Sequence, residues 1–374
     1  MNMHEQAYYS LNIYLENSVL LYAKSRNFDF GPSNRQNVSN LSKFISHRVI
    51  LEYDLVLEAL NKHEYQTVEK FIQEIFWRIY WKGWLELRPR VWTDFINYKP
   101  TGNLKTFEAA VRGKTGIVCF DDWVDELKTT NYLHNHTRMW FASIWIFTLK
   151  IPWQLGARFF LEHLYDGDAG SNTCSWRWVA GLQTKGKHYL AKSWNIEKYT
   201  NQKYSNFQLN EKSQPLYEDR KYFIEPFLHE SKEEISNDYL LITDSDLSFK
   251  NREEAYGTYK KIFLLSLSND KRTIPISKNV SKFKDKAISS FKNYFSRAEE
   301  CDNNFEEIAR NIINFDVVYP FVGENLDYIK RLESNLKLNL NFLVRREDRF
   351  CIPLCNKGFF DFKKSIPKII EIIT

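Results

Sequence analysis

The spacing of apolar residues changes near Asn237, and this change constrains the fold more than any other feature of the chain. Before Asn237, apolar side chains recur at helical spacing over long segments such as 50–62 and 65–88. After it, short apolar runs alternate with helical stretches, which is the pattern of a parallel sheet with crossover helices. We therefore predict a mainly α-helical domain over residues 1–236 and a small α/β, Rossmann-like domain over residues 237–374.

The strands and helices of the second domain follow from these runs. No G-x-G-x-x-G motif follows any of them, so nothing in the pattern supports dinucleotide binding in this domain. The strands are predicted over residues 239–243, 261–267, 317–322 and 340–344, and the helices over residues 281–296, 303–313 and 324–336.

Composition bounds the fold and says less about the partner. The chain has 374 residues, 16% aromatic residues and 13 glycines, which favours large packed helices over a many-turned all-β fold. Its net charge of +5 permits binding to nucleic acid without requiring it. Charge alone therefore does not identify a partner.

The cysteines and the apolar runs indicate a cellular compartment. The five cysteines are odd in number and form no C-x-x-C motif, which favours reduced thiols in an intracellular protein. Cys351 and Cys355 lack the accompanying His or Cys pair of a metal site. The first residues have no signal-peptide pattern, and no run approaches the ~20 apolar residues of a membrane span. We expect a soluble, cytoplasmic protein without a metal or a membrane contact.

Residues 115–180 carry most of the recognisable chemistry. Arg138 lies in an apolar helical segment, where an uncompensated charge is costly, so its guanidinium needs an anionic partner. Asp166 and Asp168 are the candidates. With Asn172 and several tryptophans nearby in sequence, these groups suit a planar, redox-active ligand with hydrogen-bonding edges, such as a flavin.

The order and spacing of these residues resemble the flavin-binding core of the photolyase/cryptochrome family. The resemblance implies an all-helical, photolyase-type domain with FAD bound in its interior. It also implies that Arg138, Asp166, Gly167, Asp168 and Asn172 contact the cofactor. The matching positions are Thr115-Gly116, Asp121, Tyr132-Leu133-His134-Asn135-His136-Thr137-Arg138-Met139, Trp153-Gln154-Leu155-Gly156-Ala157-Arg158-Phe159-Phe160, Asp166-Gly167-Asp168, Asn172 and Trp176-Arg177-Trp178.

A segment nearer the start of the chain resembles the phosphate-binding segment of the family. Hydroxyl and backbone N–H groups at the opening of a helix bind anions, and the resemblance assigns Tyr22, Ser39, Asn40, Leu41 and Ser42 to the cofactor. Taken alone, Ser39 and Ser42 would be ordinary helix N-caps. The two parts of the match are Tyr22-x-x-x-Arg26-Asn27-Phe28 and Val38-Ser39-Asn40-Leu41-Ser42-Lys43-Phe44-Ile45.

This segment also departs from the family pattern. The loop before Ser39 is longer than usual, and Val38 and Lys43 stand where the family has threonine and proline. Arg35 and Lys43 are candidates to supply positive charge to the phosphates in their place.

Segment 65–88 carries Glu74, Trp77 and Arg78 on one helical face, at spacings of three and four residues. They match the E-x-x-W-R motif of the family, which implies a site for two flipped-out pyrimidines. The resemblance implies that Trp77 stacks on the lesion, Glu74 accepts from base edges or supplies a proton, and Arg78 meets a phosphate or the flavin. The alternative is an ordinary buried aromatic face with an ion pair between Glu74 and Arg78.

Other matches indicate which branch of the family the chain resembles. Asn135, Met139 and Trp178 match the dimer-repairing photolyases, which implies that they contact the lesion, and Asn135 the cofactor as well. Asn172 stands where photolyases have an asparagine beside the flavin N5 position. His134 is expected to be structural.

The resemblance also implies an electron relay. Trp176 and Trp153 match the inner and middle indoles of the three-tryptophan relay that reduces the flavin. The outermost indole corresponds to Pro100, so that end of the relay is absent. Tyr98 and Trp92 are candidates to replace it.

Together these matches imply light-driven repair of UV-damaged DNA. In a deoxyribodipyrimidine photo-lyase, reduced FAD gives an electron to a flipped cyclobutane pyrimidine dimer, the ring splits and the electron returns. One alternative is a cryptochrome-like blue-light sensor that binds FAD without repairing DNA, and another is a DNA-binding protein with a vestigial pocket. The polar segment 180–235 is either a rim that contacts phosphates or a solvated loop.

Residues 237–374 have two readings that the sequence leaves open. Photolyases ordinarily begin with an α/β antenna domain, and this chain begins at the flavin domain. The C-terminal part is either a rearranged antenna domain or an unrelated Rossmann-like module. The sequence does not name an antenna chromophore.

Overall fold

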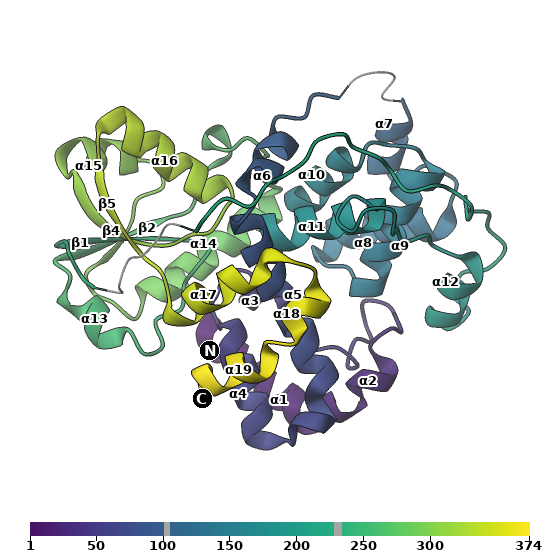
Figure 1. Cartoon of the computed structure of the whole chain (residues 1–374), viewed down its shortest axis with the longest axis horizontal. Helices are drawn as coiled ribbons and strands as arrows, with labels where there is room; N and C mark the ends of the chain where they lie inside the picture. The colour runs from purple at the N-terminus through teal and green to yellow at the C-terminus, as the bar shows by residue number, and fades with distance from the viewer. Residues whose placement is uncertain (101–104, 228–233) are drawn as a thin grey trace.

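The structure is a computed structural model that describes residues 1–100, 105–227 and 234–374. Helices make up the first part of the chain, and a parallel sheet with flanking helices makes up the second (Figure 1). The helices of the first part are α1 (Met3–Asn17), η1 (Val19–Leu21), α2 (Tyr22–Ser25), α3 (Ser42–Ile45), α4 (Glu52–Lys62), α5 (Tyr65–Glu86), α6 (Pro89–Ile96), α7 (Lys105–Val111), α8 (Val118–Thr130), α9 (Asn135–Ser143), η2 (Ile144–Thr148), α10 (Trp153–His163), α11 (Ala169–Ala180) and α12 (Ser193–Tyr199).

The long helices begin and end where local chemistry favours it. α6 has Pro89 in its first turn, where the missing N–H costs nothing. α11 begins at the N-cap Asp168, whose carboxylate accepts a hydrogen bond from the Ser171 backbone N–H, and ends at Gly181 with φ of 85°. The predicted helices 50–62 and 65–88 are confirmed as α4 and α5, each within two residues at both ends.

The second part contains a five-stranded parallel sheet with strand order β3-β2-β1-β4-β5. This is the strand order of doubly wound sheets, and Figure 1 shows α15 and α16 on one side of the sheet with α13 and α14 on the other. The strands are β1 (Tyr239–Thr243), β2 (Lys261–Leu265), β3 (Ala298–Glu300), β4 (Asn314–Val318) and β5 (Asn339–Leu343). The helices are α13 (Glu253–Thr258), η3 (Asn269–Lys271), α14 (Lys278–Lys292), α15 (Phe305–Asn311) and α16 (Glu324–Leu336).

One strand prediction needs correction, and one strand was missed. The strand expected at 317–322 is β4, which ends at Val318, and Pro320 follows it because proline cannot donate to a sheet. The polar start of β4 concealed it, since Asp316 is fully buried and accepts hydrogen bonds from Tyr259 Oη at 2.7 Å and Asn341 Nδ2 at 2.9 Å. The edge strand β3 was not predicted, because its sequence Ala-Glu-Glu has no apolar run.

After β5 the chain returns to the helical part. The last elements are α17 (Arg346–Cys351), η4 (Ile352–Asn356), α18 (Phe359–Lys363) and α19 (Ile366–Ile373), and they lie across α5 and α4 (Figure 1). A methyl group on Gly83 of α5 would lie 2.6 Å from Cys355 Sγ, so the absence of a side chain there permits close contact. The C-terminal helices are therefore packed against the same helix that carries Glu74 and Trp77.

A buried network of charges joins the helical part to the α/β part. Arg48, which follows α3, lies 2.6 Å from Asp348 of α17, 3.2 Å from Asp246 after β1, and 3.1 Å from Glu52 of α4. Arg345, after β5, lies 2.7 Å from Asp246. All five side chains are at least nine-tenths buried. Because breaking a buried pair leaves an uncompensated charge, this network holds the two parts together.

The cysteines and the helix lengths add two further observations. All five cysteines are buried, and each is a free thiol. Among residues 1–100, 105–227 and 234–374, no helix combines the length and the apolar character that crossing a bilayer requires.

Candidate functional site

An arginine–aspartate pair lies at the centre of the helical part. Arg138 of α9 places Nη2 2.9 Å from Asp166 Oδ2, in the turn before α11, and Arg138 Nε donates to the Leu133 carbonyl at 2.9 Å. Asp166 is therefore the anionic partner that the sequence required. Burial opposes ionisation of Asp166, but Arg138 and then Arg78 outweigh it and lower its pKa. The pair is ionised at neutral pH.

Two further ion pairs flank the first. Arg78 of α5 pairs with Asp168, the N-cap of α11, and Glu74 pairs with Arg26, which follows α2. Glu74 and Arg78 therefore bind partners on other elements. They do not form the ion pair with each other along α5 that the alternative interpretation of this helix predicted. Burial raises the pKa of Glu74, although Arg26 opposes that shift.

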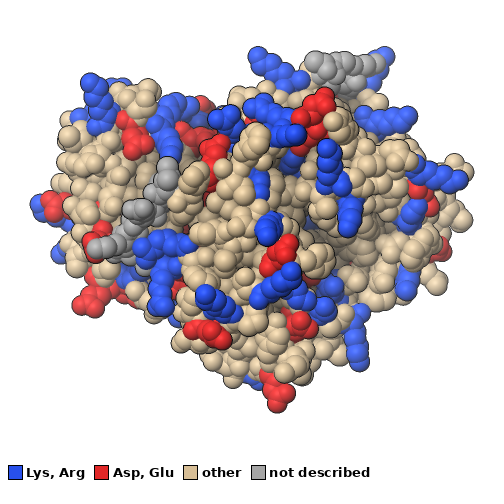
Figure 2. All heavy atoms as spheres, viewed as in Figure 1, with Lys and Arg blue, Asp and Glu red and all other residues tan. Residues whose placement is uncertain are grey.

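Several of these side chains keep accessible surface although they lie deep among the helices. Tyr22, Glu74, Tyr132 and Arg138 are surrounded by protein on nearly all sides, yet each keeps some accessible surface. The exposed fraction is 31% for the Glu74 side chain and 22% for that of Arg138. Accessible surface at such depth means that a hollow enters the helical part, and Figure 2 shows the surface hollowed between α5 and α12.

Several buried polar atoms in this part of the fold have no hydrogen-bond partner. Such an atom costs about 1–3 kcal/mol unless a ligand or a water molecule satisfies it. Ser42 adds a small share to the lowered pKa of Asp166, but neither Ser42 Oγ nor Asp166 Oδ1 has a hydrogen-bond partner of normal geometry. His134 Nε2 and Trp176 Nε1 are also buried without a partner. These donors and acceptors fit a ligand with polar ring edges, as FAD has.

The segment expected to hold phosphates is tightly turned. Asn40 has a positive φ of 53°, and its Nδ2 donates to the Arg35 carbonyl at 3.0 Å. Ser39 Oγ accepts a hydrogen bond from Leu41 N at 3.5 Å. Leu41 is the N-cap of α3 and makes no side-chain cap, so Ser39 and Ser42 are not the plain N-caps of the alternative reading.

The two cations proposed for this segment are less available than the sequence indicated. Arg35 already pairs with Glu126, lies 3.6 Å from Asp29, and places its guanidinium 4.9 Å from the centre of the Tyr132 ring. Burial, and then the charge of Lys286, lowers the pKa of Lys43. The hydroxyl and backbone groups are therefore the main candidates for phosphate contacts.

The tryptophans expected to carry electrons lie in a buried aromatic layer. Trp176 has its ring centre 5.0 Å from that of Phe160 and 6.1 Å from that of Trp145. Trp153 stacks on Phe95 at 5.5 Å. Sequence reasoning missed Trp145, whose only signal was its place in the apolar run Ile144–Thr148.

Trp92 and Tyr98, the suggested replacements for the outer indole, lie beside the Trp153 end. Phe95, which stacks on Trp153, has its ring centre 5.5 Å from that of Trp92, and Trp92 Nε1 donates to Asp327 Oδ2 at 2.7 Å. The Tyr98 carbonyl accepts a hydrogen bond from Arg158 Nη2 at 2.7 Å. Trp92 is thus one aromatic ring away from Trp153.

The residues expected to contact a lesion are spread around the hollow. Asn135, the first residue of α9, is exposed, and Met139 is half-buried one turn later. Trp178 is half-buried and stacks on Tyr189 at 5.9 Å. Asn172 is buried, and its Nδ2 donates to the Ala157 carbonyl at 2.9 Å, which fixes the orientation of the amide.

Trp77 has an unexpected neighbour. Phe359 of α18 stacks on it, with ring centres 3.5 Å apart and planes 11° apart. One face of the Trp77 indole is therefore covered by the C-terminal part of the chain. The signal in the sequence was the helical spacing of Cys355, Phe359, Phe362 and Ile366, all of which are buried.

His134 has a structural place. It is the N-cap of α9, and its Nδ1 accepts a hydrogen bond from His136 N at 3.2 Å. Burial lowers the pKa of His134 to about 4. The ring is neutral at physiological pH, and this agrees with the structural role expected of it.

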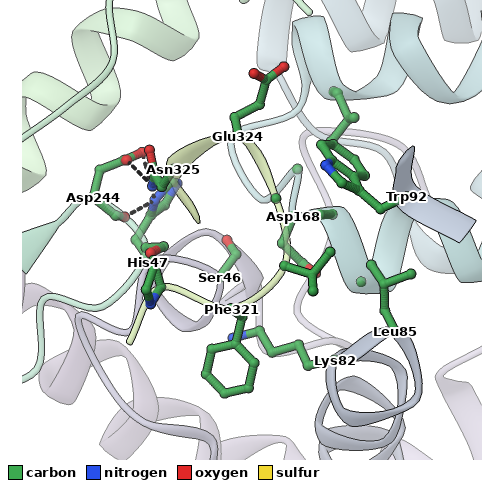
Figure 3. Close-up of a pocket in the computed structure, with 18 of the residues that line it drawn as sticks. Ser46, His47, Lys82, Leu85, Trp92, Asp168, Asp244, Phe321, Glu324 and Asn325 are labelled. Atoms are coloured by element: carbon green, nitrogen blue, oxygen red, sulfur yellow. Dashed lines mark hydrogen bonds and ion pairs between the residues drawn. The ribbon is translucent and has the colours of Figure 1, made fainter. Parts of the chain in front are cut away.

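A small cavity lies where the α/β part meets α5. It has about 100 Å³ of open space at the carboxyl ends of β1 and β4, and Ser46, His47 and Lys82 of the helical part close it (Figure 3). Asp244 lines this cavity. Its carboxylate pairs with Lys284 and accepts a hydrogen bond from Asn325 Nδ2 at 2.7 Å. The carboxyl ends of strands are where doubly wound sheets bind ligands, but this space is far smaller than an aromatic chromophore requires.

Comparisons with known proteins agree with the geometry of the helical part. Residues 70–232 match the family model of the FAD binding domain of DNA photolyase. The chain is 27% identical over 193 residues to a deoxyribodipyrimidine photo-lyase of Neurospora crassa, covering 48% of this chain and 31% of that protein. It is 35% identical over 130 residues to one of Agrobacterium fabrum, covering 33% of this chain and 27% of that protein.

A solved structure is similar over a comparable extent. The bacterial class III photolyase from Agrobacterium tumefaciens has 25% sequence identity and a TM-score of 0.45, covering 53% of this chain and 42% of that one. The chain thus spans less than half the length of the proteins it matches. The segment matched is an FAD-binding domain in those proteins, and through that segment the chain is similar to the photolyase/cryptochrome family.

Proposed function

We propose that this protein is a light-driven DNA-repair flavoprotein, a deoxyribodipyrimidine photo-lyase that acts on pyrimidine dimers in UV-damaged DNA. The observation that carries the proposal is the ionised Arg138–Asp166 pair, which together with Glu74 keeps accessible surface deep in the helical part, where several buried polar atoms lack partners. When bound, FAD supplies the absorption of light and the electron that opens the dimer. The chain supplies the groups that hold the cofactor and the lesion.

The cofactor side of the site is built mainly by α9 and α11. The Arg138 guanidinium, held by Asp166, stabilises negative charge on the isoalloxazine ring. Asn172, oriented by the Ala157 carbonyl, presents its amide oxygen to the ring. The other groups proposed to hold FAD are Tyr22, Ser39, Asn40, Leu41, Ser42, Arg78, Asn135, Gly167 and Asp168.

The substrate side is built by α5, α9 and α11. Glu74 has a raised pKa and so holds a proton at higher pH than an ordinary glutamate, which suits a donor to a base edge. Asn135 and Met139 lie on α9, and Trp178 offers an indole for stacking. Trp77 has only the face that Phe359 leaves free.

Electrons that reduce the cofactor enter through the aromatic layer in this proposal. In it Trp176 takes the inner position, as the match to the family relay implies, and Trp153 receives electrons from outside and passes them to it. Phe95 and Trp92 extend the layer beyond Trp153. Trp92 is the proposed substitute for the outer indole.

We propose the same two-domain division as the sequence pattern, with the α/β, Rossmann-like domain beginning at residue 237. The strand order β3-β2-β1-β4-β5 supports a doubly wound unit. A rearranged antenna domain and an unrelated module remain the two readings of that unit. The five free, buried cysteines support the proposal of a cytoplasmic protein.

Repair is tested directly by counting lesions. Purified protein loaded with FAD and chemically reduced is illuminated with an oligonucleotide that contains one cyclobutane dimer, with a dark sample beside it. Dimer loss that requires light supports repair. Retention of every dimer by fully reduced protein rules out the photolyase proposal, and the light-sensing alternative then accounts for FAD binding.

A variant pair locates the chemistry on α5. Glu74→Ala is expected to slow dimer loss, because it removes the carboxyl group from the hollow. The matched control is Glu69→Ala, which removes a half-buried carboxylate from the same helix, 3.7 Å from Lys363 and 2.6 Å from Gln73 Nε2. Equal effects of both changes would contradict a role for Glu74 at the site.

A further inference from the structure

The C-terminal helices present a row of basic and aromatic side chains to solvent. Lys357, Phe360, Lys364 and Lys368 are exposed, at spacings of three and four residues. We call these four residues the C-terminal stripe. Phe360 is 78% exposed, which is unusual for a phenylalanine in a segment whose other aromatic residues are buried.

The opposite side of the same segment fixes the stripe in place. Phe359, Phe362, Ile366 and Ile369 are each at least 95% buried. The Tyr80 hydroxyl of α5 donates to the Lys357 carbonyl at 2.8 Å. The segment is therefore part of the packed core on one side and does not leave α5 when a ligand arrives.

The packing places the stripe at the edge of the proposed site. Phe359 stacks on Trp77, so the exposed Phe360 is the residue next to the one that covers the indole. α18 lies in front of α5 in Figure 1, and Figure 2 shows lysine and arginine side chains, with acidic ones among them, over this part of the surface.

The charge of the stripe is largely uncompensated. Residues 357–368 contain one acidic residue, Asp361, and four lysines, of which Lys363 lies 3.7 Å from Glu69 of α5 and is not part of the stripe. Asp361 lies 2.9 Å from Lys364, but both side chains are more than half exposed, so solvent screens the pair. A polyanion can therefore replace Asp361 as the partner of Lys364 with little loss of free energy.

An exposed aromatic ring between lysines suits one kind of ligand. Single-stranded nucleic acid binds through cations that contact phosphates and aromatic rings on which bases stack. A strand from which a lesion has been flipped out has an interrupted stack beside the lesion. The exposed Phe360, next in sequence to the residue that covers Trp77, can stack on such a base.

We propose that the C-terminal stripe binds the DNA strand that carries the lesion, with Phe360 stacked on a neighbouring base and the lysines on its phosphates. This inference rests on the proposed function and extends the site beyond residues 70–232, the part that matches the family model. It gives the C-terminal helices a part in positioning the substrate. Phe360 and the lysines are positioning residues, since they do not reach the polar groups of the hollow.

The test is binding in the dark, which needs no photochemistry. FAD-loaded protein is titrated with a fluorescent oligonucleotide that contains one dimer, over a series of salt concentrations. The combined change Lys357→Ala, Lys364→Ala and Lys368→Ala is expected to flatten the slope of log affinity against log salt by about 2 to 3. The matched control makes the same charge change at three exposed lysines of the α/β part, Lys278, Lys282 and Lys330.

The aromatic residue is tested separately. Phe360→Ala is expected to weaken binding about 5- to 150-fold at fixed salt without changing the salt slope. Phe360→Trp is expected to keep the native affinity, because an indole also stacks on a base. Phe360→Leu is expected to weaken binding as Phe360→Ala does, because an aliphatic side chain does not stack. All of these side chains are exposed, and an unchanged unfolding midpoint confirms that the variants keep the fold.

The outcomes separate this inference from the proposed function. Native affinity and native salt slope in the stripe variants, with light-driven repair intact, would overturn the inference and leave the function standing. Equal loss in the control variant would also overturn it, because net charge alone would then explain the effect. If native protein neither repairs nor binds the oligonucleotide, both the inference and the function fail.

Discussion

The contact between α10 and Trp176 leads to a quantitative prediction. Gly156 of α10 lies against the Trp176 indole, and a methyl group added there would be 2.5 Å from Cζ3 and closer still to Cη2. The same methyl would be 3.0 Å from Cε2 of Trp145. Carbon atoms attract at roughly 3.5–4.0 Å, so the Trp176 ring must move by about 1 Å or more.

The surroundings leave little room for this movement. Trp176 is 2% exposed and packs against Phe141, Trp145 and Phe160, all of which are buried. Overpacking of a core costs about 1–3 kcal/mol, and we expect Gly156→Ala to reduce the free energy of unfolding by an amount near the upper end of that range. Tryptophan fluorescence of the folded protein should shift as well, because the indole changes position.

A second change shows whether Trp176 is the cause. Trp176→Phe removes the ring atoms that the new methyl would strike. The double variant should therefore lose less free energy of unfolding than the two single variants lose in sum. We expect a coupling free energy of about 0.5–3 kcal/mol between the two sites. Urea unfolding of the protein without added FAD, followed by circular dichroism, measures all three variants.

The control is a glycine with open space around it. A methyl group on Gly257 of α13 would meet nothing within 4 Å, so Gly257→Ala should leave stability unchanged or raise it by up to ~1 kcal/mol. If Gly156→Ala behaves like Gly257→Ala, or if the double variant is simply additive, the steric reasoning is refuted.

Three further predictions concern charge and electron transfer. Arg48→Met should reduce the free energy of unfolding by about 3–5 kcal/mol, because it leaves buried carboxylates without their cation, and urea unfolding measures the loss. Burial raises the pKa of Glu86 from 4.5 to about 7, so the folded protein binds a proton there that the unfolded chain has lost. Stability should therefore fall by up to about 3 kcal/mol as pH rises from 4.5 to 7. Glu86→Gln should remove that dependence in urea titrations at several pH values. Trp176→Phe should abolish photoreduction of the cofactor by an external thiol but leave repair by chemically reduced protein intact, as absorption spectra and lesion counts would show.

Each of these three predictions has an outcome that contradicts it. A loss below about 1 kcal/mol in Arg48→Met would mean that the buried carboxylates find other compensation. An unchanged pH profile in Glu86→Gln would assign the titration to another group. Equal loss of photoreduction and repair in Trp176→Phe would mean that the indole supports the whole site rather than the relay.

Periodicity predicted the regular elements well. α5 and α16 carry apolar residues at helical spacing over many turns, and their bounds were predicted within two residues. β4 was misplaced because a buried carboxylate, Asp316, interrupts its apolar pattern and is satisfied only by side chains from other segments. Such compensation comes from tertiary contacts, which local patterns do not contain.

The candidate site shows the same division. The sequence required an acid for Arg138 but could not choose between Asp166 and Asp168, which lie two residues apart on a turn. The structure assigns Asp166 to Arg138, and it assigns Asp168 to Arg78 and to the N-cap of α11. The contact of Phe359 with Trp77 joins residues far apart in the chain, so periodicity could show that Phe359 is buried but not what buries it.

The buried charge network determines how the molecule comes apart. Arg48 binds Glu52 of α4, Asp246 after β1 and Asp348 of α17. If any one of these regions unfolds, a buried charge in the others loses its partner. Unfolding should therefore be cooperative across the chain, with one transition reported both by the sheet and by the tryptophans. A molecule with separable halves would instead melt in two steps.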